Sequence, residues 1–315
     1  MWKQTLRKNF TSWEKLASFL NIDPSSILKK TPFSLNLPLR LAEKIEKGRL
    51  DDPILLQFLP STQELNTSPL FSRDPVSDAS FRTAPKLLHK YQGRALILVS
   101  SACAMHCRYC FRRHFPYETE VKGFESELNE VASDLTLSEI ILSGGDPLSL
   151  SNETLSSLFK QIDLIPHIKR IRFHTRFPVG IPERIDDSFL TLLRNSNKQI
   201  LFIIHINHPK ECDDTLFAYL KEIQKLGIPI LSQSVLLNKV NDDLDTLETL
   251  CLTLIDHGIL PYYLHQLDRV DGAAHFEVTE EKGRSLILEL RKRLPGYAVP
   301  QYVKEEAHAP HKTPL

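Results

Sequence analysis

Short apolar runs alternate with segments of helical periodicity over most of the chain. From about residue 95 onward, six runs rich in Ile, Leu, Val and Phe have the length of buried strands: 95–100, 139–143, 170–174, 200–205, 228–235 and 259–265. They recur every ~30 to 45 residues, the length of a strand–helix unit. The helical patterns between and after them are 125–135, 153–162, 213–226, 244–257 and about 279–294.

This alternation predicts an α/β fold with a parallel sheet covered by helices, because continuous apolar strands are typical of sheets that are buried on both faces. Six units predict a partial (β/α)6 barrel of the TIM type rather than a closed eight-stranded one.

The first ~90 residues predict short helices without strands. Thr11 and Glu14 have the spacing of a capping box, and Asp23-Pro24 predicts another helix start. One helical face carries the apolar residues Leu37, Leu41 and Ile45, and Gly48 ends this predicted helix. A polar, loop-like stretch covers 61–85. We therefore expect an N-terminal helical extension, residues 1–86, followed by a barrel core, residues 87–315.

Polar or unusual residues follow each apolar run, at the strand ends where parallel barrels bind ligands. They are Cys103 to Cys110, Ser143-Gly144-Gly145-Asp146, His174-Thr175-Arg176, His205-Ile206-Asn207-His208, Gln233 with Ser234 and Asn238, and His265 to Asp268. Loops are polar in any protein, but solvated loops do not need Cys, Gly-Gly and several His. We expect one active-site face built from all six ends.

Composition narrows the classes of partner. Lys plus Arg and Asp plus Glu both number 39, so the net charge is zero and a nucleic-acid or anionic-membrane binder is not expected. No apolar run has the length of a membrane span, and the N-terminus lacks the apolar segment of a signal peptide. The five Cys are an odd number, with three close together, which favours a reducing cytoplasm and one metal or redox site.

Cys103, Cys107 and Cys110 have the spacing C-x3-C-x2-C. Three thiolates can hold a four-iron cube and leave one iron open to a further ligand. A structural zinc site, completed by His106 or His114, is the alternative, although zinc cysteines come more often as two separate C-x2-C pairs. The spacing favours a [4Fe–4S] cluster.

The cysteine motif, with the aromatic Tyr109 before its third Cys, resembles the radical S-adenosylmethionine (SAM) superfamily. The resemblance implies that SAM binds the open iron and is cleaved to a radical that abstracts hydrogen from the substrate. Tyr109 is expected to stack on adenine, and Ser143-Gly144-Gly145-Asp146 to contact the SAM amine. Gln233 and His205 are further candidate SAM contacts or ordinary polar groups of the barrel mouth.

From about residue 87 the chain is also similar to lysine 2,3-aminomutases. The shared segments include Leu88-His89-Lys90-Tyr91, Cys110-Phe111-Arg112-Arg113, His205-Ile206-Asn207-His208-Pro209, Val240-Asn241-Asp242 and Lys312-Thr313-Pro314. The helical extension, Phe111 to Tyr117 and Gly272-Ala273-Ala274-His275-Phe276 are similar to the subfamily that makes (R)-β-lysine for modifying elongation factor P.

The resemblance implies pyridoxal 5′-phosphate (PLP) as a second cofactor, with Lys312 as its Schiff-base lysine. Without it, Lys312 would be taken for a surface residue of a mobile tail. Tyr91 and Arg94 match positions that hold PLP. Arg112 matches the partner of the substrate carboxylate.

Asp268 and Glu305 match the acids that hold the substrate ε-ammonium. Glu305 replaces an Asp of the family and has Glu306 beside it. From the residues alone, Arg112 is equally a cation balancing the cluster, and Asp268 a helix cap.

The activity implied is isomerisation of (S)-α-lysine to (R)-β-lysine, with an external electron donor and a functional link to elongation factor P and its lysine ligase. The alternatives are an aminomutase for another amino acid or protein-bound lysine, and a non-catalytic iron–sulfur or zinc protein. Asp243 stands where longer aminomutases have a zinc-ligand Cys, so no zinc is expected. Cys212 and Cys251 are predicted to be buried in helices.

Overall fold

The computed structural model describes residues 1–23, 33–66 and 68–315. The helix predicted to start at Asp23-Pro24 would run through residues 24–32, which lie outside these ranges. The six predicted strands form and pair in parallel, in chain order. They are β3 (Arg94–Ser100), β4 (Glu139–Gly144), β5 (Arg170–Thr175), β6 (Gln199–His205), β7 (Ile230–Val235) and β8 (Leu260–His265). The predicted partial barrel is confirmed.

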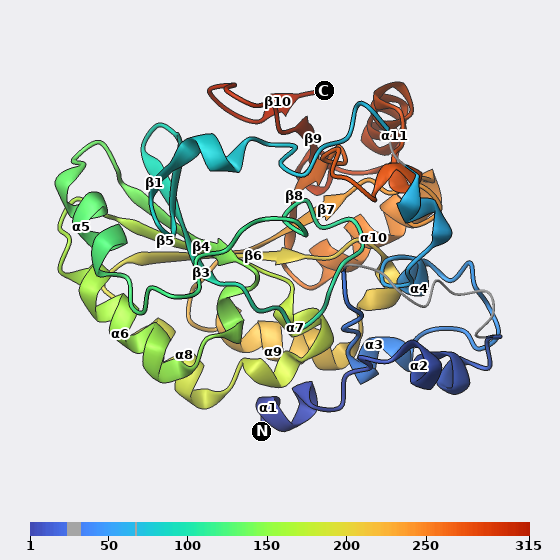
Figure 1. Ribbon diagram of the computed structural model, residues 1–315, viewed down its shortest axis with the longest axis horizontal. Coiled ribbons are helices and arrows are strands. Elements are labelled where there is room, and N and C mark those ends of the chain that lie inside the picture. Colours follow the sequence, from blue (N-terminus) through green and yellow to red (C-terminus); the bar gives the residue numbers. More distant parts are fainter. Residues whose placement is uncertain (24–32, 67) are drawn as a thin grey trace.

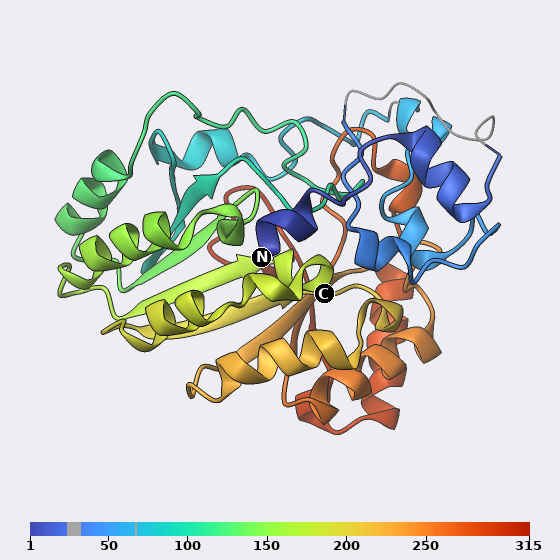
Figure 2. The same cartoon turned by 90° about the horizontal axis from the view of Figure 1, so that it is seen from below.

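Helices cover the outer face of this sheet (Figures 1 and 2). They are α5 (Glu125–Ser133), α6 (Asn152–Asp163), α8 (Asp187–Arg194), α9 (Asp214–Gln224), α10 (Leu244–Asp256) and α11 (Glu280–Arg293). Helices α6, α8, α9, α10 and α11 each begin at a side chain that accepts from a backbone N–H, which satisfies one free donor of the first turn. These caps are Ser151, Asp186, Asp213, Asp243 and Thr279. The apolar faces of α5, α6, α8 and α9 pack on the strands in one core, and α11 packs with α10 and β8 in a second cluster.

Four short strands extend the sheet at its two edges. β1 (Arg82–Ala84) and β2 (Leu87–Tyr91) are antiparallel and lead into β3. At the other edge β9 (Gln301–Lys304) is parallel to β8, and β10 (Thr313–Pro314) is antiparallel to β9. The prediction of no strands in the first ~90 residues was therefore wrong. β1 and β2 are too short and too polar to give a clear alternating pattern.

The N-terminal segment lies beyond the carboxyl ends of the parallel strands (Figure 1). Its helices are α1 (Trp2–Leu6), α2 (Trp13–Leu20), α3 (Leu39–Ala42) and α4 (Pro53–Leu56). The cap of α2 is Ser12, which accepts from the Lys15 N–H, so the box predicted from Thr11 was wrong by one residue. Leu37, Leu41 and Ile45 are all buried, but the single helical face predicted for them was wrong, because α3 contains only Leu41 and Leu37 pairs with Phe10 in a β-bridge.

The boundary at residue 86 stays a prediction, since β1 of the extension pairs with β2 of the core. Within the described ranges, no helix is both long and apolar enough to cross a bilayer.

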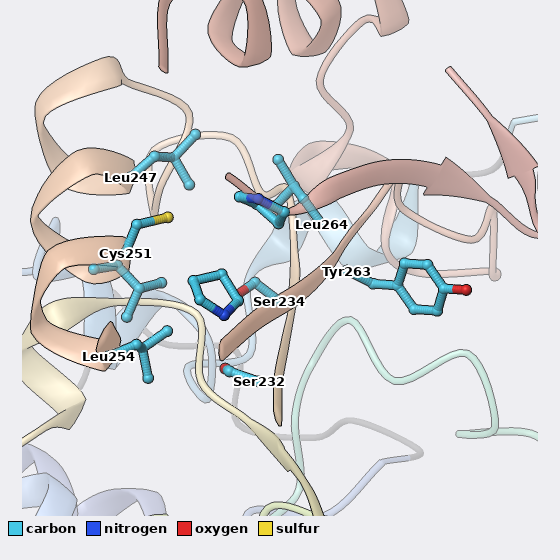
Figure 3. A pocket seen from close by; sticks show the side chains of 10 residues that line it. Ser232, Ser234, Leu247, Cys251, Leu254, Tyr263 and Leu264 are labelled. Carbon is cyan, nitrogen blue, oxygen red and sulfur yellow. The ribbon is translucent and has the colours of Figure 1, made fainter. Parts of the chain in front are cut away.

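Behind the sheet, a small cavity lies between α10 and strands β7 and β8 (Figure 3). Leu247, Cys251 and Leu254 face it from the helix, whereas the Tyr263 ring points away from the helix. Cys251 is buried in α10 as predicted. Cys212 is half-buried and lies between the turn Pro209–Glu211 and α9, not in a helix, because Asp213 caps that helix. The cavity is on the side of the sheet that α10 covers.

Candidate active site

The three cysteines of the motif lie in a loop that leaves β3 at its carboxyl end. The N-terminal segment holds this loop by its backbone. Asn36 Nδ2 donates to the Cys103 carbonyl at 3.1 Å, and the His106 N–H donates to the Asn36 carbonyl at 2.9 Å. The Arg108 N–H donates to the Gln57 carbonyl at 2.8 Å. These contacts fix the path of the loop and use none of its three sulfur atoms.

Burial acts strongly on these thiols. It raises the pKa of Cys110 to about 11, with a further contribution from the nearby Cys107. Burial, Asp146 and the other two thiols raise the pKa of Cys103 well above its ordinary value. Thiolates here need positive charge to stabilise them, which iron supplies when a cluster binds. Among the described residues, no group of three His, Cys, Asp or Glu is arranged to hold a single metal ion.

Gly144 and Gly145 allow β4 to end directly against the start of this loop. Gly144 has φ +118°, and a Cβ on it would lie 2.5 Å from the Ser100 carbonyl oxygen. A Cβ on Gly145 would lie 2.4 Å from the Ala102 carbonyl oxygen. The Gly145 N–H donates to Ser100 at 2.6 Å instead. Because no side chain fits between these two backbones, the glycine pair determines where the cysteine loop begins.

The Asp146 carboxylate joins the ends of β4 and β5. It accepts from the N–H groups of Leu148, Arg176 and Phe177 at 2.8 to 3.0 Å and from the Thr175 hydroxyl at 2.7 Å. Burial raises its pKa to about 6 against these hydrogen bonds, which lower it. Its oxygens are thus engaged within the protein. The SAM-amine contact predicted for Asp146 stays a prediction.

A buried network connects Tyr109 to the strand ends. Its hydroxyl accepts from Asn207 Nδ2 at 2.6 Å and from the Arg176 guanidinium. Its half-buried ring is edge-on to Phe276, with 6.1 Å between centroids. Arg176 also donates to the Cys107 sulfur at 2.9 Å. Stacking of Tyr109 on adenine stays a prediction, and the hydroxyl ties the residue to the cysteine loop.

Lys312 and Glu305 meet at the opposite edge of the barrel. Lys312 Nζ lies 2.5 Å from Glu305 Oε2, and Glu305 also binds Lys90 Nζ at 2.6 Å and the Tyr91 hydroxyl. Burial works against its charge, but Lys312 and these donors lower the pKa of Glu305 to about 2. Lys312 immediately precedes β10, which pairs with β9, so it is not in a mobile tail.

Asp268 faces the same charges from the end of β8. Burial raises its pKa to about 7, Lys312 opposes this, and Glu305 adds to it. Burial and nearby charges cause this shift, and no described residue donates a hydrogen bond to the carboxylate or forms an ion pair with it. The Glu306 side chain is instead partly exposed to solvent, where it pairs with Lys304 and accepts from the Thr313 hydroxyl. Of the two glutamates, Glu305 is therefore the one on the inner side with Asp268.

Arg112 lies between the cysteine loop and β4. Its Nε donates to Asp78 at 2.7 Å, and its Nη1 is 3.5 Å from the Ser143 hydroxyl. Burial lowers its pKa, but Asp78 and neighbouring groups raise it above the ordinary value, so the guanidinium stays charged. Arg94 lies over the Tyr91 ring, 4.6 Å from its centroid.

The inner strand ends also carry neutral imidazoles. Gln233 Nε2 is in contact with the His205 ring. Burial lowers the pKa of His205 to about 3, and it lowers those of His174 and His265 well below the ordinary value. The Lys312 ammonium contributes to the lowered pKa of all three histidines. The structure thus brings cysteines, arginine, lysine and acids to one barrel mouth.

Known proteins match this chain over its whole length. Residues 92–177 match the family model described as a 4Fe-4S single cluster domain. An L-lysine 2,3-aminomutase of Escherichia coli (strain K12) is 42% identical and covers 100% of this chain and 94% of its own. One from Haemophilus influenzae is 39% identical, covering 99% and 94%. The chain belongs to the lysine 2,3-aminomutase family. The predicted family resemblance is confirmed.

A more distant lysine 2,3-aminomutase, from Clostridium subterminale, is 30% identical and covers 90% of this chain and 68% of its own. A solved structure of a Streptococcus suis protein bound to S-adenosylmethionine has a TM-score of 0.49 and 13% identity, covering 70% of this chain and 52% of that one. A match at this TM-score and identity does not bear on the function of the chain.

Several residues that shape this lysine 2,3-aminomutase site were not found from the sequence. Glu64 binds Arg108 and Arg113 of the cysteine loop, and Asp78 binds Arg112. Both acids come from the stretch 61–85 that was predicted only as polar loop. The signal available was charge complementarity between that stretch and the arginines of the loop. Lys90 was within a matched motif but had been given no role.

Proposed function

We propose that this chain is a radical SAM, PLP-dependent lysine 2,3-aminomutase that converts (S)-α-lysine to (R)-β-lysine. The observation that carries the proposal is the placement of two sets of groups at one barrel mouth. The cysteine loop follows β3, and Lys312, Asp268 and Glu305 lie beyond β8 and β9. The whole-length likeness to L-lysine 2,3-aminomutases supports the same activity.

The donor set fits both cofactors. Cys103, Cys107 and Cys110 would hold the [4Fe–4S] cluster, whose reduced form supplies the electron that cleaves SAM. Ser143, the glycine pair and Gln233 would line the SAM site. Lys312, Tyr91 and Arg94 would hold PLP, which supplies a π-system for the migrating nitrogen.

The chain's own residues would bind and orient the substrate. The Arg112 guanidinium is charged and partly engaged, with an N–H edge left for a substrate carboxylate. Asp268, with no donor of its own among the described residues, would accept the ε-ammonium. Glu305 binds the Lys312 ammonium in this structure. When that contact is released, Glu305 would accept the substrate ε-ammonium together with Asp268. The distance between guanidinium and acids would then select an amino acid of lysine length.

The same proposal includes a cellular role. (R)-β-Lysine would be passed to a lysine ligase that modifies elongation factor P, and an external donor would reduce the cluster. The helical N-terminal extension and the motifs shared with that subfamily support this role. A reducing cytoplasm suits all five cysteines, which are free thiols.

Product analysis tests the activity directly. Anaerobically reconstituted protein incubated with L-lysine, SAM, PLP and dithionite is expected to form β-lysine, identified by chromatography of the derivatised amino acids and mass spectrometry. Omission of SAM is the matched control. If lysine stayed unchanged while a lysyl-protein or another amino acid was isomerised, the substrate assignment would be wrong and the chemistry would stand.

Replacing Asp268 by Asn tests the ammonium clamp. A carboxyl with a pKa of about 7 is charged above that pH and neutral below it. Lysine affinity should therefore rise as pH increases through about 7. In the variant, KM for lysine should rise roughly 10- to 100-fold and lose this pH dependence, because a charge-assisted hydrogen bond is lost. SAM cleavage without lysine should change little. An unaltered KM would assign Asp268 to helix or loop structure instead.

A further inference from the structure

A second set of buried groups contacts the cysteine loop. Arg176 lies just beyond β5, and its side chain has only 8% of its surface exposed. Its Nη1 donates to the Cys107 sulfur at 2.9 Å and to the Tyr109 hydroxyl. Arginine is seldom buried without an anionic partner, and Arg176 combines such a partner, Glu211, with a hydrogen bond to a sulfur atom of the cysteine motif.

The opposite edge of the same guanidinium is held by the N-terminal segment and the end of β6. Nη2 donates to Gln57 Oε1 at 2.7 Å and to Glu211 Oε2 at 2.8 Å. Gln57 and Glu211 are both fully buried, and Gln57 Nε2 donates to Glu211 Oε1 at 3.1 Å. Asn207 completes the network by donating to Gln57 and to Tyr109.

The anchoring of this network is rigid. Glu211 accepts from the backbone N–H groups of Asn207 and His208 at 3.2 and 3.1 Å, so its carboxylate cannot follow a moving arginine. Gln57 follows α4, and its carbonyl accepts from the Arg108 N–H of the cysteine loop. Arg176 is therefore fixed toward Cys107 by groups that are themselves fixed by backbone contacts.

We propose that Arg176 is a positioning residue that sets the reduction potential of the cluster through its hydrogen bond to Cys107. Reduction adds one electron to the iron–sulfur group, and much of the added charge is spread onto the thiolate sulfurs. A donor with a positive charge at one sulfur stabilises the reduced form and raises the potential. Cys107 thereby differs from Cys103 and Cys110, and the N-terminal segment takes part in electron uptake through Gln57.

This inference rests on the proposed cluster site, and its test separates the two. The midpoint potential is measured by anaerobic titration without SAM or lysine, followed by electron paramagnetic resonance of the reduced cluster. In Arg176→Met, the ratio of reduced to oxidised cluster at a fixed poise near the wild-type midpoint should fall roughly tenfold. Failure of wild-type protein to bind iron would instead contradict the cluster site itself.

A charge-neutral double variant isolates the hydrogen bond. Arg176→Met alone leaves Glu211 as a buried unpaired charge, which lowers the potential by itself and destabilises the fold. Combining it with Glu211→Gln removes both charges of the pair. The double variant should still show a potential below wild type. Glu211→Gln alone, which leaves Arg176 without its counter-charge, should raise the potential.

Arg184→Met is the matched control for losing a buried arginine. Arg184 is fully buried but donates to the Leu148 and Leu150 carbonyls, at 2.6 and 3.0 Å. The cluster in the Arg184→Met variant should have the same midpoint potential as the wild-type cluster. The proposal is overturned if the double variant keeps the wild-type potential, or if it folds by circular dichroism but binds no iron, because Arg176 would then serve assembly rather than electron uptake.

Discussion

Replacing Cys107 by Ser should leave a folded protein that holds little or no [4Fe–4S] cluster and cleaves no SAM. A serine hydroxyl is a poor ligand for iron, and two thiolates do not retain a cube that needs three. Iron and sulfide content after anaerobic reconstitution, together with the brown absorption, measure the loss. β-Lysine formation should fall below detection at the same time.

Cys212→Ser is the control for this experiment. Cys212 is a free, half-buried thiol close to the barrel mouth but outside the motif loop. Its variant should keep the iron content and the activity of wild type. Equal iron content in both variants would show that the three-cysteine loop is not where the metal binds.

Replacing Lys312 by Ala should remove covalently bound PLP and nearly all turnover, while the cluster stays in place. The ammonium of Lys312 lies on the inner side of β9, against Glu305 and among the strand-end histidines. Loss of a group that acts directly on the cofactor should cost about two orders of magnitude or more in rate. The visible absorption band of lysine-bound PLP, and its fixation by borohydride, report the covalent link separately from activity.

Lys304→Ala provides the matched lysine. Lys304 ends β9 and pairs with Glu280 and Glu306 on the outer side, at 3.3 and 3.0 Å. The Lys304→Ala variant should bind PLP as the wild-type protein does. In Lys312→Ala, Glu305 keeps Lys90 and Tyr91 as partners, so the fold should persist. A borohydride-fixed adduct that remained in Lys312→Ala would assign the link to another lysine.

The barrel was predictable from sequence because short runs with buried apolar residues recur between helical segments, even where Arg170 and Arg172 interrupt the run in β5. The cysteine loop was predictable from spacing within eight residues. Lys312 was not predictable from the residues alone, because its environment is made by Glu305 and by strand ends far away in the chain. Resemblance to a family supplied what local pattern does not contain.

Arg176 shows the same limit. It was noted as polar at a strand end, but its partners Cys107 and Gln57 are 69 and 119 residues away. Asp146 likewise has four donors within the protein that the sequence did not indicate, and its predicted contact with the SAM amine stays a prediction. Long-range pairing decides which polar residue faces a ligand and which supports the scaffold.

The two edges of the open barrel meet through side chains. The strand ladder runs from β1 to β10 without closing on itself within the described residues, and the contact from Lys90 and Tyr91 to Glu305 spans the gap. Widening this seam breaks ionic contacts but no strand-to-strand backbone hydrogen bond. Because the Lys90 and Glu305 side chains are each only 10% exposed, salt screens these contacts weakly, and buried ionic contacts rather than a strand pairing hold the two edges together.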